Sequence, residues 1–304
     1  MVTNNKQYNN ERKFQSDLIK RDMDRQGALQ EMYLESYTRM QKQIDDFYLR
    51  YANSEGLSIG EARKRANEMD VKAFNDRAAK AVKNKDFSND TNEFLKLYNL
   101  KMKVSRLELL KANLQLEIQN LHADAYDMMN EARYEEQKAI LDHLKEQSGV
   151  LRISGSNLAS QYKSILDADF YGTKFSQNIW NSNGLQSQLQ KDVFSSLSRI
   201  YTDMNGYKKE RTYLYKKYNT SRNNAERLLK TEIGRIQSQT REAVYKENGF
   251  THYVVVAEPK ACSICSPYDG KEIKLSDREM GVNAPLFHPN CRCSDYGVVR
   301  LEDK

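Results

Sequence analysis

The chain has 304 residues, and none of its first 258 is a proline or a cysteine. Average proline usage near 5% would place about 13 prolines in that stretch, so a loop-rich or proline-linker organisation is excluded there. The chain therefore changes character near residue 250 and joins two kinds of module. The prolines and cysteines are Pro259, Pro267, Pro285, Pro289, Cys262, Cys265, Cys291 and Cys293.

Composition narrows the class of protein. Charged residues make up 30% of the chain and hydrophobic ones 39%, so a large compact core is not expected. No run of 18 apolar residues exists, and residues 1–15 lack the apolar stretch of a signal peptide, so we expect no membrane span, no export and a reducing compartment. The net charge is +6, and the last 54 residues carry seven basic and eight acidic side chains. The basic excess therefore belongs to the first 250 residues.

Apolar residues recur at spacings of three and four in two long stretches, which predicts helices. No Gly or Pro interrupts residues 93–147, and a helix of that length would span roughly 80 Å and resembles a coiled coil. Its apolar stripe needs another helix, either in an antiparallel hairpin of the same chain, which we favour, or in another copy or partner. The stripes are Leu29, Tyr33, Tyr37, Met40, Ile44, Phe47 and Tyr51, then Leu97, Leu100, Val104, Leu107, Leu114 and Leu121.

Two glycines near residue 150 break the helical period and mark a boundary. Beyond it we expect helices over 185–201 and 223–248, with Gly249 as the C-terminal cap and Trp180 as a packing anchor. The predicted organisation is an elongated helical region over 1–150, a helical core over 151–249 and a small β-rich module over 250–304.

The terminal module reads as strands at Tyr253–Val256, Lys271–Leu275 and Tyr296–Leu301. So few residues bury little apolar surface, and such modules usually need a metal, a disulfide or a partner. The sequence as a whole predicts a mainly α protein, with an elongated body of long coiled-coil-like helices and a small C-terminal zinc-clamped β module.

Five side chains compete for the four positions of a tetrahedral zinc site. Cys262 and Cys265 form a Cys-x2-Cys knuckle, and the pair that completes the site is His288 with Cys291 or Cys293, or the two cysteines together. Two disulfides are the alternative, but reducing conditions and the nearby histidine argue against them. Because ligands are in surplus, we expect a structural Zn²⁺.

The segment 207–218 mixes cations with tyrosines, which can hold phosphates and stack on bases. It predicts a weak, nonspecific double-stranded DNA site. The alternative is a solvated helix whose rings pack inward, and this reading is somewhat favoured. The cations are Lys208, Lys209, Arg211, Lys216 and Lys217.

Over roughly residues 158–299 the chain resembles the phage Mu protein F-like minor head proteins, also called head morphogenesis proteins. Three motifs carry the resemblance in order: a helical region around Ile179-Trp180, the helix through Thr231-Glu232, and the terminal signature. That signature joins the Cys-x2-Cys knuckle, an Asp269-Gly270-Lys271 turn and an HPNCRC loop over 288–293. The chain has Ala284-Pro285-Leu286 where the family often has a proline pair, a departure that touches packing rather than ligation. Residues 1–150 carry no family motif.

The resemblance implies a minor capsid protein of a tailed phage, made in the host cytoplasm and placed in the virion, inside the head near the portal. It would aid head assembly, contact the portal protein and capsid or scaffolding proteins, and bind or accompany DNA at ejection. We expect no enzyme activity, because Asp269 and Glu272 read as turn and strand surface. The alternative is a zinc-dependent nuclease or hydrolase delivered with phage DNA.

Overall fold

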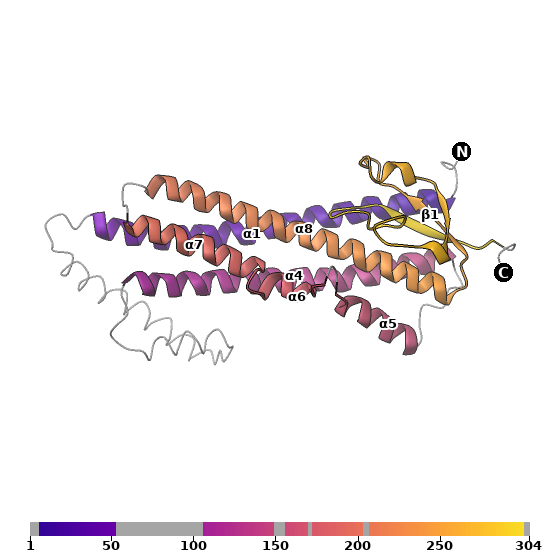
Figure 1. Cartoon of the computed structure of the whole chain (residues 1–304), viewed down its shortest axis with the longest axis horizontal. Helices are drawn as coiled ribbons and strands as arrows, with labels where there is room; N and C mark the ends of the chain where they lie inside the picture. The colour runs from indigo at the N-terminus through magenta and orange to yellow at the C-terminus, as the bar shows by residue number, and fades with distance from the viewer. Residues whose placement is uncertain (1–5, 53–105, 149–155, 170–171, 203–206, 301–304) are drawn as a thin grey trace. The chain divides into compact units, whose positions relative to one another are not determined.

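The computed structural model describes residues 6–52, 106–148, 156–169, 172–202 and 207–300. It confirms a mainly helical chain with a small C-terminal sheet (Figure 1). The helices are α1 (Lys6–Ala52), α4 (Arg106–Ser148), α5 (Ser156–Asp167), α6 (Phe175–Trp180), α7 (Leu185–Thr202) and α8 (Tyr207–Glu247); the strands are β1 (His252–Val256), β2 (Glu272–Lys274) and β3 (Ser294–Val298). No helix among these residues combines the length and apolarity needed to cross a bilayer.

The chain divides into two compact units, and α1, α4 and α8 contribute residues to both. Unit 1 comprises Met1–Gln30, Tyr126–Asn178 and Arg222–Lys304, and unit 2 comprises Glu31–Ala125 and Ile179–Ser221. The division of the sequence at residues 150 and 249 stays a prediction.

In unit 2 the predicted stripe of α1 is buried and meets α4. Tyr33, Met40 and Ile44 are at most 2% exposed. The Tyr33 hydroxyl lies 3.4 Å from Nε2 of His122, and Arg39 donates to Glu117 across 2.8 Å. Residue numbers rise along α1 while they fall along α4, so these segments are antiparallel within one chain, as favoured from the sequence. The predictions for Phe47, Tyr51 and residues 97–107 lie outside the described side chains.

Two sequence predictions in unit 2 are wrong. Trp180 is 39% exposed, whereas its neighbour Ile179 is fully buried, because consecutive helical residues point about 100° apart and Ile179 takes the inner face. The helix predicted from residue 223 begins at Tyr207, since Leu214, Tyr218 and Ser221 extend its buried face at helical spacing.

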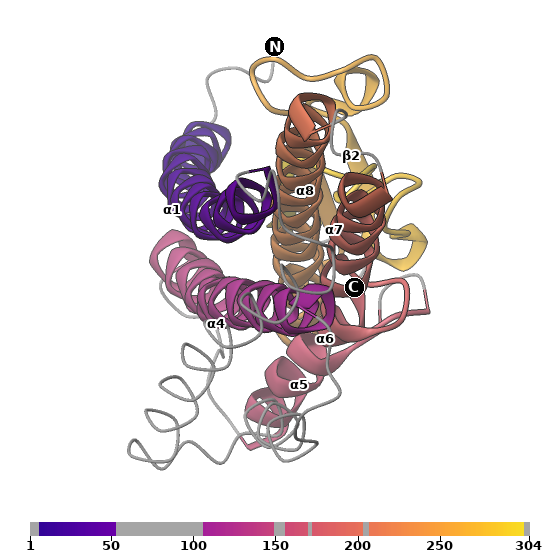
Figure 2. The same ribbon diagram turned by 90° about the vertical axis from the view of Figure 1, so that its left-hand side faces the viewer.

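In unit 1 the segments of α1, α4 and α8 lie side by side (Figure 2). Buried Glu136 of α4 accepts hydrogen bonds from Arg21 and Arg25 of α1 and from Gln237 of α8. Glu11 of α1 is also fully buried and pairs with Arg241 of α8. These paired charges therefore link the three helices at buried positions, where an unpaired charge would destabilise the fold.

The sheet has the strand order β2-β1-β3, with antiparallel neighbours. Tyr253 and Val255 of the central strand pack into the main core of unit 1, whereas Val254 and Val256 pack with Tyr8 on the other face. Burial on both faces explains why β1 is a continuous apolar run rather than an alternating one. The predicted strands are confirmed, although β3 begins at Ser294, directly after the last cysteine.

The connection from α8 into β1 uses the predicted glycine cap. Gly249 has φ +68°, and the next amide, of Phe250, donates to the carbonyl of Tyr245 across 3.1 Å. A glycine meets no Cβ penalty in this left-handed conformation. The Phe250 ring then covers Gly297 of β3, where a Cβ would lie 2.5 Å from the ring.

Candidate metal centre

The Cys-x2-Cys knuckle is a tight turn that aims two sulfurs the same way. The amides of Cys265 and Ser266 donate to the carbonyl of Cys262 across 3.1 and 2.9 Å. Backbone N–H groups of Cys265 and Ile264 also point at the Cys262 sulfur and lower the pKa of its thiol. The turn thus favours a thiolate, which is the metal-binding form of cysteine.

The HPNC segment is a type II turn that brings the second set of ligands. The amide of Cys291 donates to the carbonyl of His288 across 3.0 Å, and Asn290 has φ +66°. Type II turns favour Pro at the second position and need Gly or Asn at the third, which are Pro289 and Asn290 here. The local sequence therefore fixes the spacing of His288 and Cys291.

The two turns meet at a cluster of sulfur and nitrogen atoms. Nε2 of His288 lies 3.2 Å from Sγ of both Cys262 and Cys265. Sγ of Cys265 lies 3.8 Å from Sγ of Cys291. Tetrahedral zinc, with Zn–S near 2.3 Å and Zn–N near 2.0 Å, requires ligand separations of about 3.8 Å between sulfurs and about 3.5 Å between sulfur and nitrogen. The cluster could bind a metal with little adjustment.

All five predicted ligands come together, in two overlapping groups. One contains Cys262, Cys265 and His288, and the other contains Cys265, Cys291 and Cys293; within each, the ligand atoms lie within 4.8 Å of one another. Cys265 belongs to both groups. The choice of four ligands from five thus stays open.

A hydrogen bond joins the thiols of Cys291 and Cys293. The hydrogen bond from Cys293 lowers the pKa of Cys291 to about 6 and raises the pKa of Cys293 itself. Metal binding displaces protons of this kind.

The ring of His288 is oriented by its own loop. Nδ1 lies 2.8 Å from the carbonyl oxygen of Pro289. A carbonyl only accepts, so Nδ1 carries a hydrogen, and Nε2 is the ring nitrogen that could bind a metal beside the two knuckle sulfurs. A backbone carbonyl that fixes the ring tautomer is the usual arrangement behind a histidine ligand.

Helix α8 supports the centre through a row of small or polar residues. Oγ1 of Thr231 accepts from the amide of Asn290 across 3.2 Å, and a Cβ on Gly234 would lie 2.8 Å from Cδ1 of Leu286. Ser238 donates to the carbonyl of Pro285. Thr231 belongs to a motif that carries the family resemblance, but the sequence predicted no contact for Thr231, Gly234 or Ser238. Their spacing of three and four residues puts them on one face of the helix, and this was the signal that could have found them.

The two acidic residues near the centre have structural partners. Asp269 accepts from the Tyr8 hydroxyl at 3.0 Å and from the amide of Ala257 at 2.9 Å. Glu272 forms a two-point ion pair with Arg300, at 2.6 Å for each oxygen. These contacts match the reading of both acids as turn and strand surface.

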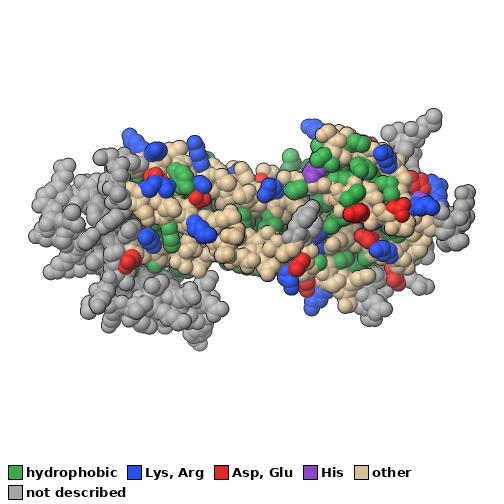
Figure 3. Space-filling model, in the orientation of Figure 1, with side chains coloured by type: hydrophobic (Ala, Val, Ile, Leu, Met, Phe, Trp, Pro, Cys, Tyr) green, Lys and Arg blue, Asp and Glu red, His purple; other side chains and the backbone are tan. Residues whose placement is uncertain are grey.

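The predicted DNA-binding cations lie on the first turns of α8, in unit 2. Lys208, Lys209, Arg211 and Lys216 are exposed, whereas Lys217 pairs with Asp192 across 3.0 Å. Figure 3 shows Lys and Arg side chains over α7 and the start of α8, with Asp and Glu among them.

The tyrosines interleaved with these cations mostly face inward or are bonded. Tyr218 is 2% exposed, and Tyr213 donates to Asp192. Tyr215 is 50% exposed. This arrangement resembles the solvated-helix alternative more than a row of stacking rings.

Comparison with known proteins identifies one family. Residues 187–295 match the model of the Phage Mu protein F like protein family, whereas none of the curated proteins and none of the solved structures matches the chain. The match covers α7, α8 and most of the sheet module, including all five candidate ligands, but not the region around Ile179-Trp180 that contributed to the resemblance. Residues 187–295 are therefore similar to the phage Mu protein F like family, the family that the sequence motifs resemble.

Proposed function

We propose that this protein is a minor structural protein of a tailed-phage head and acts in head assembly. One observation carries the proposal: the segment that matches the family, 187–295, coincides with the helices and strands that build and support the Cys/His cluster. The family match supports association with the virion.

The metal of the cluster is Zn²⁺ in this proposal, and its role is structural. Four thiols and one imidazole are the donors that zinc prefers. When bound, zinc would cross-link the knuckle to the HPNCRC loop. Hydrogen bonds with Thr231 and Ser238 of α8 hold the segment that carries His288 and Cys291. Strand β1 packs the sheet against the core of unit 1.

The absence of enzyme activity is part of the same proposal. A catalytic zinc needs an open coordination position and a positioned acid or base. Here four thiols and one imidazole are available for four positions, and the carboxylates of Asp269 and Glu272 are held by Tyr8 and Arg300. No observation on the described residues favours the nuclease or hydrolase alternative.

The proposal places the protein inside the head near the portal, with the portal protein and capsid or scaffolding proteins as partners. The basic excess of the first 250 residues and the exposed lysines of α8 support weak, nonspecific contact with double-stranded DNA. A protein in that position could accompany DNA at ejection.

The experiment that tests the function compares phage particles made with the full chain and with a chain lacking residues 158–304. Mass spectrometry of purified particles should detect only the full chain, and electron microscopy should show defective heads with the truncated one. Crosslinking of intact particles should join the full chain to the portal protein. Normal heads that contain neither form would contradict a role in assembly.

A further inference from the structure

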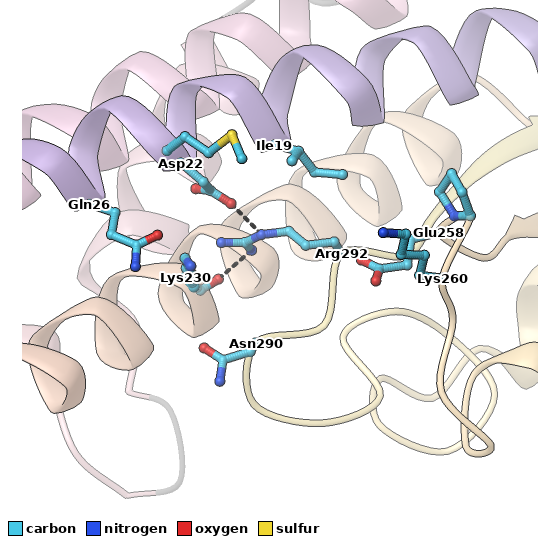
Figure 4. A pocket seen from close by; sticks show the side chains of 10 residues that line it. Ile19, Asp22, Gln26, Lys230, Glu258, Lys260, Asn290 and Arg292 are labelled. Carbon is cyan, nitrogen blue, oxygen red and sulfur yellow. Dashed lines mark hydrogen bonds and ion pairs between the residues drawn. The ribbon is translucent and has the colours of Figure 1, made fainter.

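Unit 1 contains a cavity of about 460 Å³ that the proposed function does not use (Figure 4). Its walls come from α1, from α8, from the loop after β1 and from the HPNCRC loop. The volume lies within the range of pockets that bind small ligands or single side chains. The metal-binding cluster lies outside it, since none of the five candidate ligands lines the cavity.

A buried ion pair crosses the cavity. Arg292 reaches from the HPNCRC loop to Asp22 on α1, and the two side chains are 6% and 7% exposed (Figure 4). Nη1 of Arg292 donates to the carbonyl of Lys230 across 2.7 Å. Nη2 of Arg292 is buried and has no hydrogen-bond partner among the described residues. A buried guanidinium N–H without an acceptor lowers the stability of the fold, and a ligand that accepts from it would remove this cost.

The charges around this donor favour an anionic ligand. Asp22 is neutralised by Arg292, and its second oxygen lies 3.9 Å from Nη1 of Arg25. Lys230 and Lys260 line the same cavity, and neither side chain forms an ion pair within the described ranges. Glu258 is the one lining carboxylate besides Asp22, so three cations outnumber two carboxylates.

The cavity also has an apolar side. Ile19, Met23 and Pro259 line it, and Met23 is 66% exposed, which is high for a large apolar side chain. Inorganic phosphate or a DNA backbone would make no use of such a wall. A peptide carries a carboxylate and an apolar side chain together, so it matches both parts of the cavity.

We propose that this cavity binds an acidic peptide segment of a partner protein. A Glu or Asp carboxylate accepts from Nη2 of Arg292 and lies near the ammonium groups of Lys230 and Lys260. A neighbouring apolar side chain of the peptide covers Ile19 and Met23. This inference goes beyond the head-assembly role, because it concerns binding by the purified protein and holds whether or not the protein enters a head.

The test titrates full-length, metal-loaded protein with acetyl-Leu-Glu-Leu-amide and follows binding by NMR. The matched neutral peptide, acetyl-Leu-Gln-Leu-amide, should bind about tenfold more weakly, because it lacks the charge that completes the guanidinium. The double variant Lys230→Gln/Lys260→Gln should lose a similar factor, and Met23→Ser should weaken both peptides alike. Lys163→Gln, an exposed lysine of α5 outside the cavity, is the control and should bind as the wild type does.

Because Arg292 lies between two candidate metal ligands, the test changes the two lysines and Met23 and leaves Arg292 in place. Equal binding of the two peptides would overturn the proposal, as would wild-type affinity in the double lysine variant. Inorganic phosphate and a short DNA duplex are added as competitors. The peptide proposal is contradicted if phosphate or the duplex binds more tightly than the acidic peptide and Met23→Ser has no effect. That result would assign the cavity to phosphate.

Discussion

Sγ of Cys265 lies 3.8 Å from Sγ of Cys291, although 26 residues separate them in the chain. Both side chains are nearly fully buried, at 1% and 3% exposure, in the main core of unit 1. The candidate metal centre is therefore continuous with the core. Losing the metal should disturb packing around β1 and α8 as well as the loops that carry the ligands.

Metal content is the first prediction. Purified, freshly reduced protein should contain about one zinc per chain, because the two overlapping ligand groups can form one tetrahedral site. Cys265→Ser should bring this close to zero, since Cys265 belongs to both groups, while circular dichroism should keep most of the helical signal. Ser263→Ala changes an exposed residue of the same knuckle and should keep the zinc. Metal analysis that finds none in the wild type would refute the zinc assignment.

The buried pair of Glu11 and Arg241 predicts a pH dependence of stability. Burial raises the pKa of Glu11, but the charge of Arg241 and the hydrogen bond with His143 outweigh it and lower the pKa to about 2. The folded pKa lies below the unfolded value near 4.3, so ionised Glu11 stabilises the fold above about pH 5. That contribution, on the order of 3 kcal/mol, is lost as the pH falls toward 2.

Glu11→Gln should therefore lower the free energy of unfolding at pH 7 by about 3 kcal/mol and flatten its decline between about pH 5 and pH 3. Urea unfolding at several pH values measures both effects. Glu146→Gln, an exposed carboxylate of α4, should change stability by less than about 0.5 kcal/mol. An unchanged free energy in Glu11→Gln would show that the pair contributes nothing.

The close approach at Gly234 predicts that α8 controls the metal loop. In Gly234→Ala the new Cβ comes too close only to the flexible end of Leu286, at 2.8 Å, and lies in ordinary contact with the carbonyl oxygen of Cys291 at 3.5 Å. The gain in helix propensity offsets the close contact, so stability should change by less than about 1 kcal/mol. Gly234→Leu should displace the loop that carries His288 and Cys291 and weaken zinc binding by about tenfold or more. Competition with a chromophoric chelator measures this, and Arg227→Leu on the exposed face of α8 is the control. Wild-type zinc affinity in Gly234→Leu would contradict the account.

The lysines of α8 give a prediction about DNA. Replacing exposed Lys208, Lys209 and Lys216 together by Gln should weaken duplex binding and flatten its salt dependence, since each lost phosphate contact removes about 0.9 from the slope of log K against log salt. Lys217→Gln should have a smaller effect, because Lys217 already pairs with Asp192. Fluorescence anisotropy at several salt concentrations measures both. Unchanged binding in the triple variant would assign this face to solubility or to a protein partner.

Local patterns predicted most of the helices, the strands and the Cys-x2-Cys knuckle, because each depends on neighbours in sequence. The knuckle and the cap at Gly249 are of this kind. Contacts between distant segments could not be predicted in the same way. Glu11 lies 230 residues from Arg241, and nothing in the helical period of α1 marks it as buried. Trp180 was misassigned because residue type alone does not say which side of a short helix end faces inward.

The most direct test of the central claim, that the metal shapes a head protein and performs no chemistry, is incorporation into phage particles. Cys265→Ser, Ser263→Ala and Glu272→Gln chains are supplied to phage lacking the gene, and quantitative mass spectrometry and infectivity are measured on purified particles. Cys265→Ser should be lost from particles in step with its folding. Ser263→Ala and Glu272→Gln should be incorporated and infectious, because neither side chain is a candidate ligand. Wild-type incorporation of Cys265→Ser, or a folded and incorporated Glu272→Gln whose particles fail after DNA entry, would contradict the account.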